Sequence, residues 1–253
     1  MTARYKPFLL ISTRPEDNAC AAELVSFREK MGLIDDEIIQ VRLEQAPLGD
    51  FDIEDYSGIV LGGSPFNSSD AVKTELQQRV EADIARIMTD VLERDFPLFG
   101  ACYGIGAVGT SIGAVVDPTY GETASVVDIS LTDEGKVDPV LEGMPPVWQS
   151  MVGHKDAITS LPGHAVLLAS GESCPVQMFR VGSNVYATQF HPELDPEAFA
   201  YRLRVYEGRG YYGPGELDGI IATTVNVDLS VDDLLLRNFA RIHRRPLETG
   251  FGE

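Results

Sequence analysis

The chain has 253 residues, 44% of them hydrophobic and 23% charged, so it can bury a full core and has the charge content of a globular protein. Its formal net charge of −19 argues against nucleic acid and anionic membrane surfaces as partners, because both are negatively charged. Three widely spaced cysteines provide neither a disulfide framework nor a paired-cysteine metal site. We therefore expect a cytoplasmic protein with reduced thiols, no metal, no cofactor and no membrane segment.

The first half of the chain alternates short apolar runs with helical patterns. Strands are predicted over residues 8–12, 38–43, 58–61 and 97–99, and helices over 19–30, after the cap residues Asp17 and Asn18, and from Asp70 to Val91. In the second helix the apolar side chains recur at spacings of three and four. This alternation is typical of a doubly wound α/β fold, with a mainly parallel sheet and helices on both faces.

After residue 114 short strand candidates follow one another, which predicts an antiparallel extension of the sheet. These candidates cover residues 124–131, 147–151, 165–169, 176–181 and 185–190. A helix is expected over 196–207, with Pro196 in its first turn, and a capping pattern at Ser230 predicts the start of another. Between them, residues 206–215 are rich in glycine and tyrosine and could form a lid, a partner-docking loop or a surface connection. We expect one domain over residues 1–253.

A glycine cluster after the strand at 97–99 has two competing interpretations, beside the possibility that Cys102 is a buried structural cysteine. Gly104, Gly106 and Gly109 spell G-x-G-x-x-G between a strand and a helix, as in a dinucleotide site, and Asp128 lies where a ribose-binding acid is expected. Alternatively, Gly100 and Gly104 flank Cys102 two residues away on either side, as in a nucleophile elbow. In this second interpretation, the positive end of the helix that starts after Cys102 would stabilise its thiolate. The Tyr103 amide would face the oxyanion that develops in the reaction.

A thiol nucleophile needs a base, and the base needs a group that orients it. His191 follows a predicted strand, and Glu193, two residues later, is placed to accept a hydrogen bond from its ring. His164 and His243 are interpreted as a turn residue and a helix-end residue. His154 lies at another strand end and is a candidate for the substrate site.

Gly-Ala-Cys-Tyr-Gly at 100–104 and Gln-Phe-His-Pro-Glu at 189–193 together resemble the two signatures of class I glutamine amidotransferases. The glycine turn at 60–65 is similar to that family's oxyanion loop, and the segment 147–156 is similar to the substrate-site border of the glutaminase domain of GMP synthase. The resemblance spans roughly residues 8–195, which leaves 196–253 as a C-terminal extension.

The resemblance implies a catalytic triad of Cys102, His191 and Glu193, and an oxyanion hole made by the amides of Gly63 and Tyr103. It also implies a set of substrate-binding residues, namely Gly62, Gly106, Met151, Val152, Gly153 and His154. The implied reaction releases ammonia from glutamine through a thioester. In the family the ammonia passes to a synthase partner or to a synthase domain fused in the same chain.

Two positions depart from the family pattern. Gly106 stands where the family usually has a glutamine that helps to hold the substrate, and Ser64 stands where many members have proline. The triad chemistry requires neither residue, but specificity for free glutamine depends on such polar contacts. Three hypotheses stay open: a glutaminase with an unidentified ammonia acceptor, a hydrolase of γ-glutamyl conjugates with the same triad, and a non-catalytic or dinucleotide-binding module. The oligomeric state is not determined by the sequence.

Overall fold

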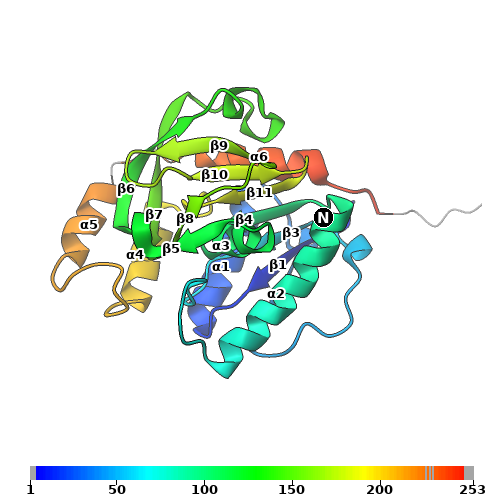
Figure 1. Cartoon of the computed structure of the whole chain (residues 1–253), viewed down its shortest axis with the longest axis horizontal. Helices are drawn as coiled ribbons and strands as arrows, with labels where there is room; N and C mark the ends of the chain where they lie inside the picture. The colour runs from blue at the N-terminus through cyan, green and yellow to red at the C-terminus, as the bar shows by residue number, and fades with distance from the viewer. Residues whose placement is uncertain (1–3, 226, 228, 230, 248–253) are drawn as a thin grey trace, which may run out of the picture.

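The computed structural model describes residues 4–225, 227, 229 and 231–247, and its centre is a nine-stranded sheet with the order β2-β1-β3-β4-β11-β10-β9-β6-β7 (Figure 1). The strands of this sheet are β1 (Phe8–Ser12), β2 (Ile38–Arg42), β3 (Gly58–Leu61), β4 (Leu98–Ala101), β6 (Glu122–Leu131), β7 (Val147–His154), β9 (Ala165–Gly171), β10 (Met178–Val181) and β11 (Val185–Thr188). Two further strands, β5 (Val115–Asp117) and β8 (Ala157–Ser160), pair with each other. The α-helices are α1 (Asp17–Lys30), α2 (Glu75–Arg94), α3 (Tyr103–Ser111), α4 (Pro196–Val205), α5 (Leu217–Thr224) and α6 (Asp232–His243).

The sheet has a parallel half and an antiparallel half. Strands β2, β1, β3, β4 and β11 pair in parallel, whereas β10, β9, β6 and β7 continue the sheet in antiparallel pairs. The predicted fold class, a mainly parallel α/β sheet with an antiparallel extension, is confirmed. Of the described helices, none is both long and apolar enough to span a membrane.

Helices cover both faces of the parallel half because its strands are apolar on both faces. Phe8 and Leu10 of β1 pack in one core with Phe27 of α1 and Phe239 of α6. The alternate residues of β1 pack in a second core with α2 and α3. Phe239 brings α6 close to the sheet, because its ring centroid lies 5.4 Å from that of Phe99. The single-domain assignment and its division at residue 195 stay predictions.

Several predicted boundaries were wrong for identifiable reasons. Helix α2 begins at Glu75 rather than Asp70, because Thr74 caps it by accepting a hydrogen bond from the Gln77 amide, and Val72 before it is 90% exposed. In α1 the expected caps Asp17 and Asn18 lie inside the helix, whose N-cap is Glu16. Strands β5 and β8 and helix α5 were not predicted.

The C-terminal region was predicted in part. Helix α4 has Pro196 in its first turn, as expected, and Asp195 caps it by accepting from the Ala198 amide. Ser230, where a capping pattern predicted the last helix, lies outside the described residues. Helix α6 begins at Asp232, and its N-cap, Val231, makes no side-chain cap.

Candidate active site

Cys102 occupies a sharp turn between β4 and α3 at the carboxyl edge of the parallel strands. Its backbone has φ 54° and ψ −97°, a conformation that residues with a Cβ rarely adopt. The Cys102 amide donates to the Thr188 carbonyl at 2.8 Å, and the Cys102 carbonyl accepts from the Ile105 amide at 3.1 Å. Strain of this kind is held in place at functional turns by the surrounding structure. The turn therefore has the conformation expected of a nucleophile elbow.

The two glycines beside the elbow have no room for side chains. A Cβ at Gly100 would lie 2.9 Å from the backbone of Gly104, and a Cβ at Gly104 would lie 2.8 Å from the Leu61 carbonyl oxygen. Gly104, Gly106 and Gly109 all lie inside α3 rather than in a loop before it. A dinucleotide site has its first glycine in the tight turn between strand and helix, whereas here Cys102 occupies that turn. The structure thus contradicts the dinucleotide interpretation.

His191 and Glu193 follow β11 and form a buried hydrogen-bonded pair. His191 Nδ1 lies 2.8 Å from Glu193 Oε1, and Glu193 is completely buried. The His191 amide donates to the Met151 carbonyl at 2.9 Å, which fixes the histidine beside β7. Burial disfavours the imidazolium, but the Glu193 carboxylate and the Cys102 sulfur outweigh it and raise the pKa of His191 to about 9. Cys102, His191 and Glu193 are therefore electrostatically coupled, as a triad requires.

Arg202, from α4, contacts the His191–Glu193 pair, and the sequence did not indicate this. Its Nη1 donates to Glu193 Oε1 at 2.7 Å, the same oxygen that faces His191, and lies 3.4 Å from His191 Nδ1. Burial would raise the pKa of Glu193, but His191 and then Arg202 hold it well below its usual range. The carboxylate is therefore charged. The only sequence signal was the predicted helix at 196–207, which did not indicate the direction of this side chain.

A second arginine, Arg14, borders the expected oxyanion loop. It is only 3% exposed, its Nε donates to Glu23 Oε1 at 2.9 Å, and its Nη1 donates to the Tyr206 hydroxyl at 2.8 Å. A Cβ at Gly63 would overlap Nη2 of Arg14 and would lie 3.6 Å from His191 Cε1. A side chain at position 63 would therefore displace the Arg14 guanidinium from its place beside the histidine. The roles of the Gly63 and Tyr103 amides as an oxyanion hole stay predictions.

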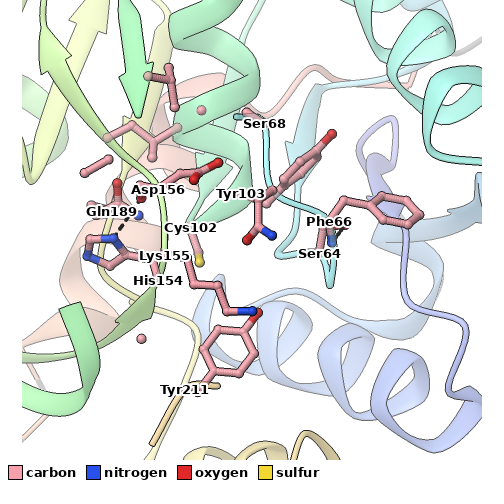
Figure 2. Close-up of a pocket in the computed structure, with 16 residues that line it drawn as sticks. Ser64, Phe66, Ser68, Cys102, Tyr103, His154, Lys155, Asp156, Gln189 and Tyr211 are labelled. Atoms are coloured by element: carbon pink, nitrogen blue, oxygen red, sulfur yellow. Dashed lines mark hydrogen bonds between the residues drawn. The ribbon is translucent and has the colours of Figure 1, made fainter. Parts of the chain in front are cut away.

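Two cavities meet at Cys102. The first, about 380 Å³ including space open to solvent, is lined by Tyr103, Gly106, Gln189 and the segment 153–157 (Figure 2). The second, about 410 Å³ on the same measure, is lined by His191, both arginines and apolar side chains of α4. The residues shared by both cavities are Ser64, Cys102, Gly153 and Tyr211.

The six predicted substrate-binding residues divide into two groups. Gly106, Gly153 and His154 line the first cavity. Met151 and Val152 lie behind it, because both side chains are completely buried in apolar cores. Gly62 lines neither cavity.

Gly62 instead packs on Glu23, whose carboxylate would lie 2.7 Å from a Cβ at that position. Direct substrate contact through the side chains of Met151 and Val152, or through Gly62, is therefore not supported.

The space beside Gly106 is partly filled from a neighbouring loop. A Cβ at Gly106 would lie 2.7 Å from the Ser68 hydroxyl oxygen. Ser68 therefore brings a polar group to the place where the missing glutamine side chain would begin. Gln189 adds another, because it lines the same cavity, is 1% exposed, and its Oε1 has no hydrogen-bond partner in the described part of the chain.

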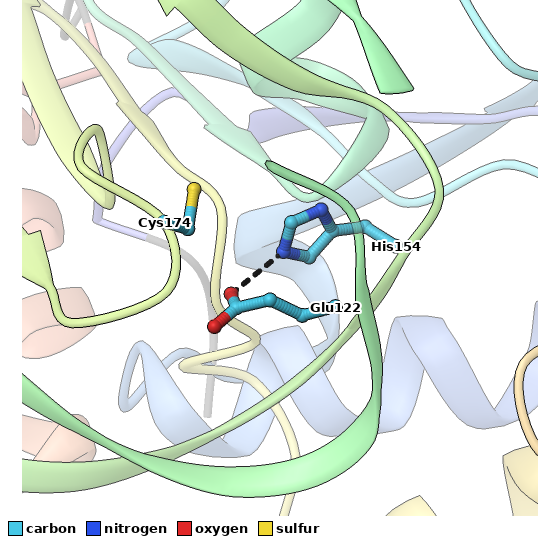
Figure 3. A group of neighbouring side chains, drawn as sticks. All are labelled: Glu122, His154 and Cys174. Carbon is cyan, nitrogen blue, oxygen red and sulfur yellow. Dashed lines mark hydrogen bonds and ion pairs between the residues drawn. The ribbon is translucent and has the colours of Figure 1, made fainter. Parts of the chain in front are cut away.

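His154 is held from both sides at the edge of the first cavity. Its Nδ1 lies 2.8 Å from the Asp156 carbonyl oxygen, and its Nε2 lies 2.9 Å from Glu122 Oε2 (Figure 3). Glu122 Oε2 also accepts from Gln177 at 2.8 Å. Donor atoms of Glu122, His154 and Cys174 lie within 4.8 Å of one another, a grouping that could hold a metal ion. These hydrogen bonds hold the His154 ring between Glu122 and the loop that carries Asp156, and its role at the substrate site stays a prediction.

Tyr211 brings the glycine- and tyrosine-rich segment onto the site. Its carbonyl accepts from the Ala124 amide at 2.9 Å, and Lys155 Nζ lies 5.3 Å from the centre of its ring. Figure 2 shows the Tyr211 ring next to Lys155 and close to Cys102. Burial, followed by the charge of Cys102, raises the pKa of Tyr211 to about 12. This segment therefore forms part of the site wall, and sequence periodicity had no means of showing it.

Comparisons with known structures agree with this architecture. A glutamine amidotransferase from Thermotoga maritima superimposes with a TM-score of 0.75 and 17% identity, covering 94% of this chain and 98% of that one. A glutamine amido transferase from Methylobacillus flagellatus superimposes with a TM-score of 0.72 and 16% identity, covering 98% and 100%. At these identities the similarity establishes the fold.

Sequence comparisons identify the family. The "GMP synthase [glutamine-hydrolyzing]" of Salmonella typhimurium is 31% identical over 153 residues, which cover 54% of this chain and 25% of the relative. That of Aliivibrio salmonicida is 29% identical over 146 residues, covering 56% and 26%. The match thus spans about a quarter of the length of these curated relatives. The family described as Glutamine amidotransferase class-I matches residues 34–203, and the chain therefore belongs to the class I glutamine amidotransferases.

Proposed function

We propose that the protein hydrolyses the side-chain amide of glutamine through a thioester on Cys102. The observation that carries this proposal is the left-handed elbow of Cys102, which lies between two cavities and is coupled to the His191–Glu193 pair. An imidazolium beside a thiolate is the resting arrangement that a cysteine nucleophile needs. The raised pKa of His191 supports that arrangement at neutral pH.

The reaction proceeds in two balanced steps. The Cys102 thiolate attacks the amide carbon, and the negative charge that develops on its oxygen is stabilised by the amides of Gly63 and Tyr103. As the carbon–nitrogen bond breaks, His191 gives its proton to the nitrogen and ammonia departs. Water then attacks the thioester while His191 accepts a proton from it, which releases glutamate and restores the Cys102 thiolate and the His191 imidazolium. Glu193 holds the ring and balances its charge throughout.

In this proposal the acyl part of glutamine occupies the first cavity, although Gly106 has no side chain to hold it. Ser68, Gln189 and the backbone around Gly153 bring polar groups to its wall. Buried polar groups that are free to pair with a substrate discriminate strongly against ligands that cannot satisfy them. These contacts support glutamine as a substrate without the usual glutamine side chain.

The test measures glutamate and ammonia released in equal amounts from glutamine. We expect Cys102→Ala to abolish both, because no other cysteine of the described part of the chain lines either cavity. Cys20→Ala is the matched control, since Cys20 is a buried free cysteine in α1 that lines neither cavity. Undiminished release in Cys102→Ala would contradict the proposal.

We further propose that a synthase partner uses the ammonia. The curated relatives are named as glutamine-hydrolysing GMP synthases, and their remaining length has no counterpart in the match. The isolated chain is then expected to release ammonia slowly and to turn over faster when its acceptor is bound. A rate that does not change on addition of a co-purifying synthase would contradict this part.

A second candidate function is the hydrolysis of γ-glutamyl conjugates by the same triad. The observation that favours it is the second cavity, which extends from His191 along α4 and has an apolar wall that ammonia does not require. Comparing turnover of glutamine with that of nitrogen-substituted γ-glutamyl amides separates the two candidates. Equal or lower turnover of every conjugate would favour the glutaminase.

A further inference from the structure

The two cavities at Cys102 differ in which catalytic group they reach. His191 lines the second cavity, whereas Tyr103 and Gln189 line the first. The histidine must deliver its proton to the departing nitrogen, so that nitrogen has to face the cavity that His191 lines. The acyl half of the substrate then occupies the first cavity, and whatever is bonded to the nitrogen extends into the second.

The second cavity has the composition of a binding site for an organic group rather than a passage for ammonia. Leu194, Phe199 and Leu203 give it an apolar wall, and Tyr206 and Tyr211 also line it. Apolar walls with a few directed polar groups are typical of small-molecule sites. The cavity therefore has a lining that suits a substituent on the leaving nitrogen.

Arg14 gives this cavity a buried positive charge with unused donor capacity. Its Nε and Nη1 are bonded to Glu23 and Tyr206, but its Nη2 donates to no group in the part of the chain that the structure describes. Arg202 lines the same cavity and, among the described residues, pairs only through Nη1. The chain as a whole has a net charge of −19, so a cavity lined by two positively charged guanidinium groups differs from the rest of the molecule. Guanidinium groups with free N–H donors match carboxylates in geometry and charge.

We infer that the second cavity is a leaving-group site for γ-glutamyl amides whose amine carries a carboxylate, and that Arg14 determines this specificity. The inference rests on the proposed thioester chemistry. The Cys102 sulfur bonds to the γ-carbonyl carbon, the carbon–nitrogen bond breaks, and His191 protonates the nitrogen to give a free amino acid. Water then hydrolyses the thioester to glutamate, so the products are glutamate and the amino acid.

The experiment compares kcat/KM for glutamine, γ-glutamylglycine and γ-glutamylethylamide. The last two have leaving groups of similar length, with and without a carboxylate. We expect γ-glutamylglycine to exceed γ-glutamylethylamide by about ten-fold or more, as a charge-assisted hydrogen bond allows. In Arg14→Met this preference should fall to about three-fold or less. Arg204→Met is the matched control, because Arg204 is exposed on α4 and should retain the preference.

Loss of Arg14 alone leaves Glu23 as an unpaired buried carboxylate, which can unfold the protein. The double variant Arg14→Met/Glu23→Gln removes both charges and provides a folded alternative, in which the preference should also be lost. A further readout is the binding of γ-glutamylglycine to Cys102→Ala by calorimetry, which requires no turnover. The site would be supported if γ-glutamylglycine binds tightly to Cys102→Ala and about ten-fold more weakly when Arg14→Met and Glu23→Gln are added to that variant.

The outcomes separate this inference from the proposed function. Thiol-dependent hydrolysis of glutamine with no preference for γ-glutamylglycine would overturn the leaving-group site and leave the glutaminase intact. A preference that persists in both Arg14 variants would overturn the role of Arg14. If glutamine is not hydrolysed at all, the proposed function fails, and absence of γ-glutamylglycine binding to Cys102→Ala would then reject the site as well.

Discussion

Glu193 and Arg202 act on His191 with opposite signs, so their removal should shift the pH dependence in opposite directions. Glu193 Oε1 lies 2.8 Å from His191 Nδ1, and Arg202 Nη1 lies 3.4 Å from the same nitrogen. His191 must be protonated to release the leaving nitrogen, so kcat/KM should fall as the pH rises through about 9, the pKa of His191. In Glu193→Gln this alkaline limb should move down, and in Arg202→Gln it should move up.

The size of each shift follows from the contacts. Without the Glu193 charge, burial opposes the imidazolium, and the pKa of His191 should fall from about 9 toward its usual value of 6.5. That change of up to about 2.5 pH units corresponds to about 3 kcal/mol. Removal of the Arg202 charge should raise the pKa of His191, and with it the midpoint of the alkaline limb, by about one pH unit. The effect is smaller because Glu193 already balances most of the arginine's charge.

The assay is the pH profile of kcat/KM for glutamine between pH 6 and 10, with thermal denaturation recorded at each pH. Glu197→Gln is the matched control, since Glu197 is an exposed carboxylate in the first turn of α4. Its profile should coincide with that of the unmodified protein. Shifts of the same sign in Glu193→Gln and Arg202→Gln, or no shift in either, would refute the assigned electrostatics.

Three further outcomes are expected from variants elsewhere in the chain. Gly104→Ala should abolish turnover and lower the melting temperature, because its Cβ would lie 2.8 Å from a backbone oxygen, whereas Gly163→Ala, with no atom within 4 Å, should leave both unchanged. Gly106→Gln should lower the KM for glutamine, because the new side chain can contact the substrate once Ser68 rotates away. It should also raise the melting temperature, because glycine is a poor helix former. An unchanged KM would count against this. Burial raises the pKa of Asp232 to about 7. The contribution of Asp232 to the unfolding free energy should therefore decrease by about 3 kcal/mol as the pH rises from 4 to 7. Urea titrations at the two pH values should show a decrease of this size in the unmodified protein relative to Asp232→Asn.

The elements that were predicted correctly are those whose own residues determine them. All four residues of β3 are buried and apolar, and the predicted bounds 58–61 match it. The motif around Cys102 was recognisable because a nucleophile elbow requires glycine at the positions beside the nucleophile. The motif around His191 was recognisable because the histidine has its carboxylate partner two residues away. In contrast, the start of α2 was misplaced because Val72 fits the helical spacing but is exposed to solvent.

The contacts that sequence did not show join distant positions. Arg14 meets Tyr206 across 192 positions, and a single arginine in sequence has no mark that separates a buried ion pair from a surface charge. Tyr211 reaches Cys102 only because its backbone pairs with Ala124, at the start of the antiparallel extension. Strand β8 has four residues and pairs only with β5, so it has too little pattern to be detected.

The most direct test of the central claim is the intact mass of the protein after rapid acid quenching of its reaction with glutamine. The account predicts a covalent adduct of one γ-glutamyl group, located on Cys102 by peptide mapping and absent from Cys102→Ala. Lowering the pH at the moment of quenching should preserve the thioester, because hydrolysis needs His191 as a base. An adduct on Cys20 or Cys174, or turnover of glutamine with no adduct on Cys102 under any quench time, would contradict the account.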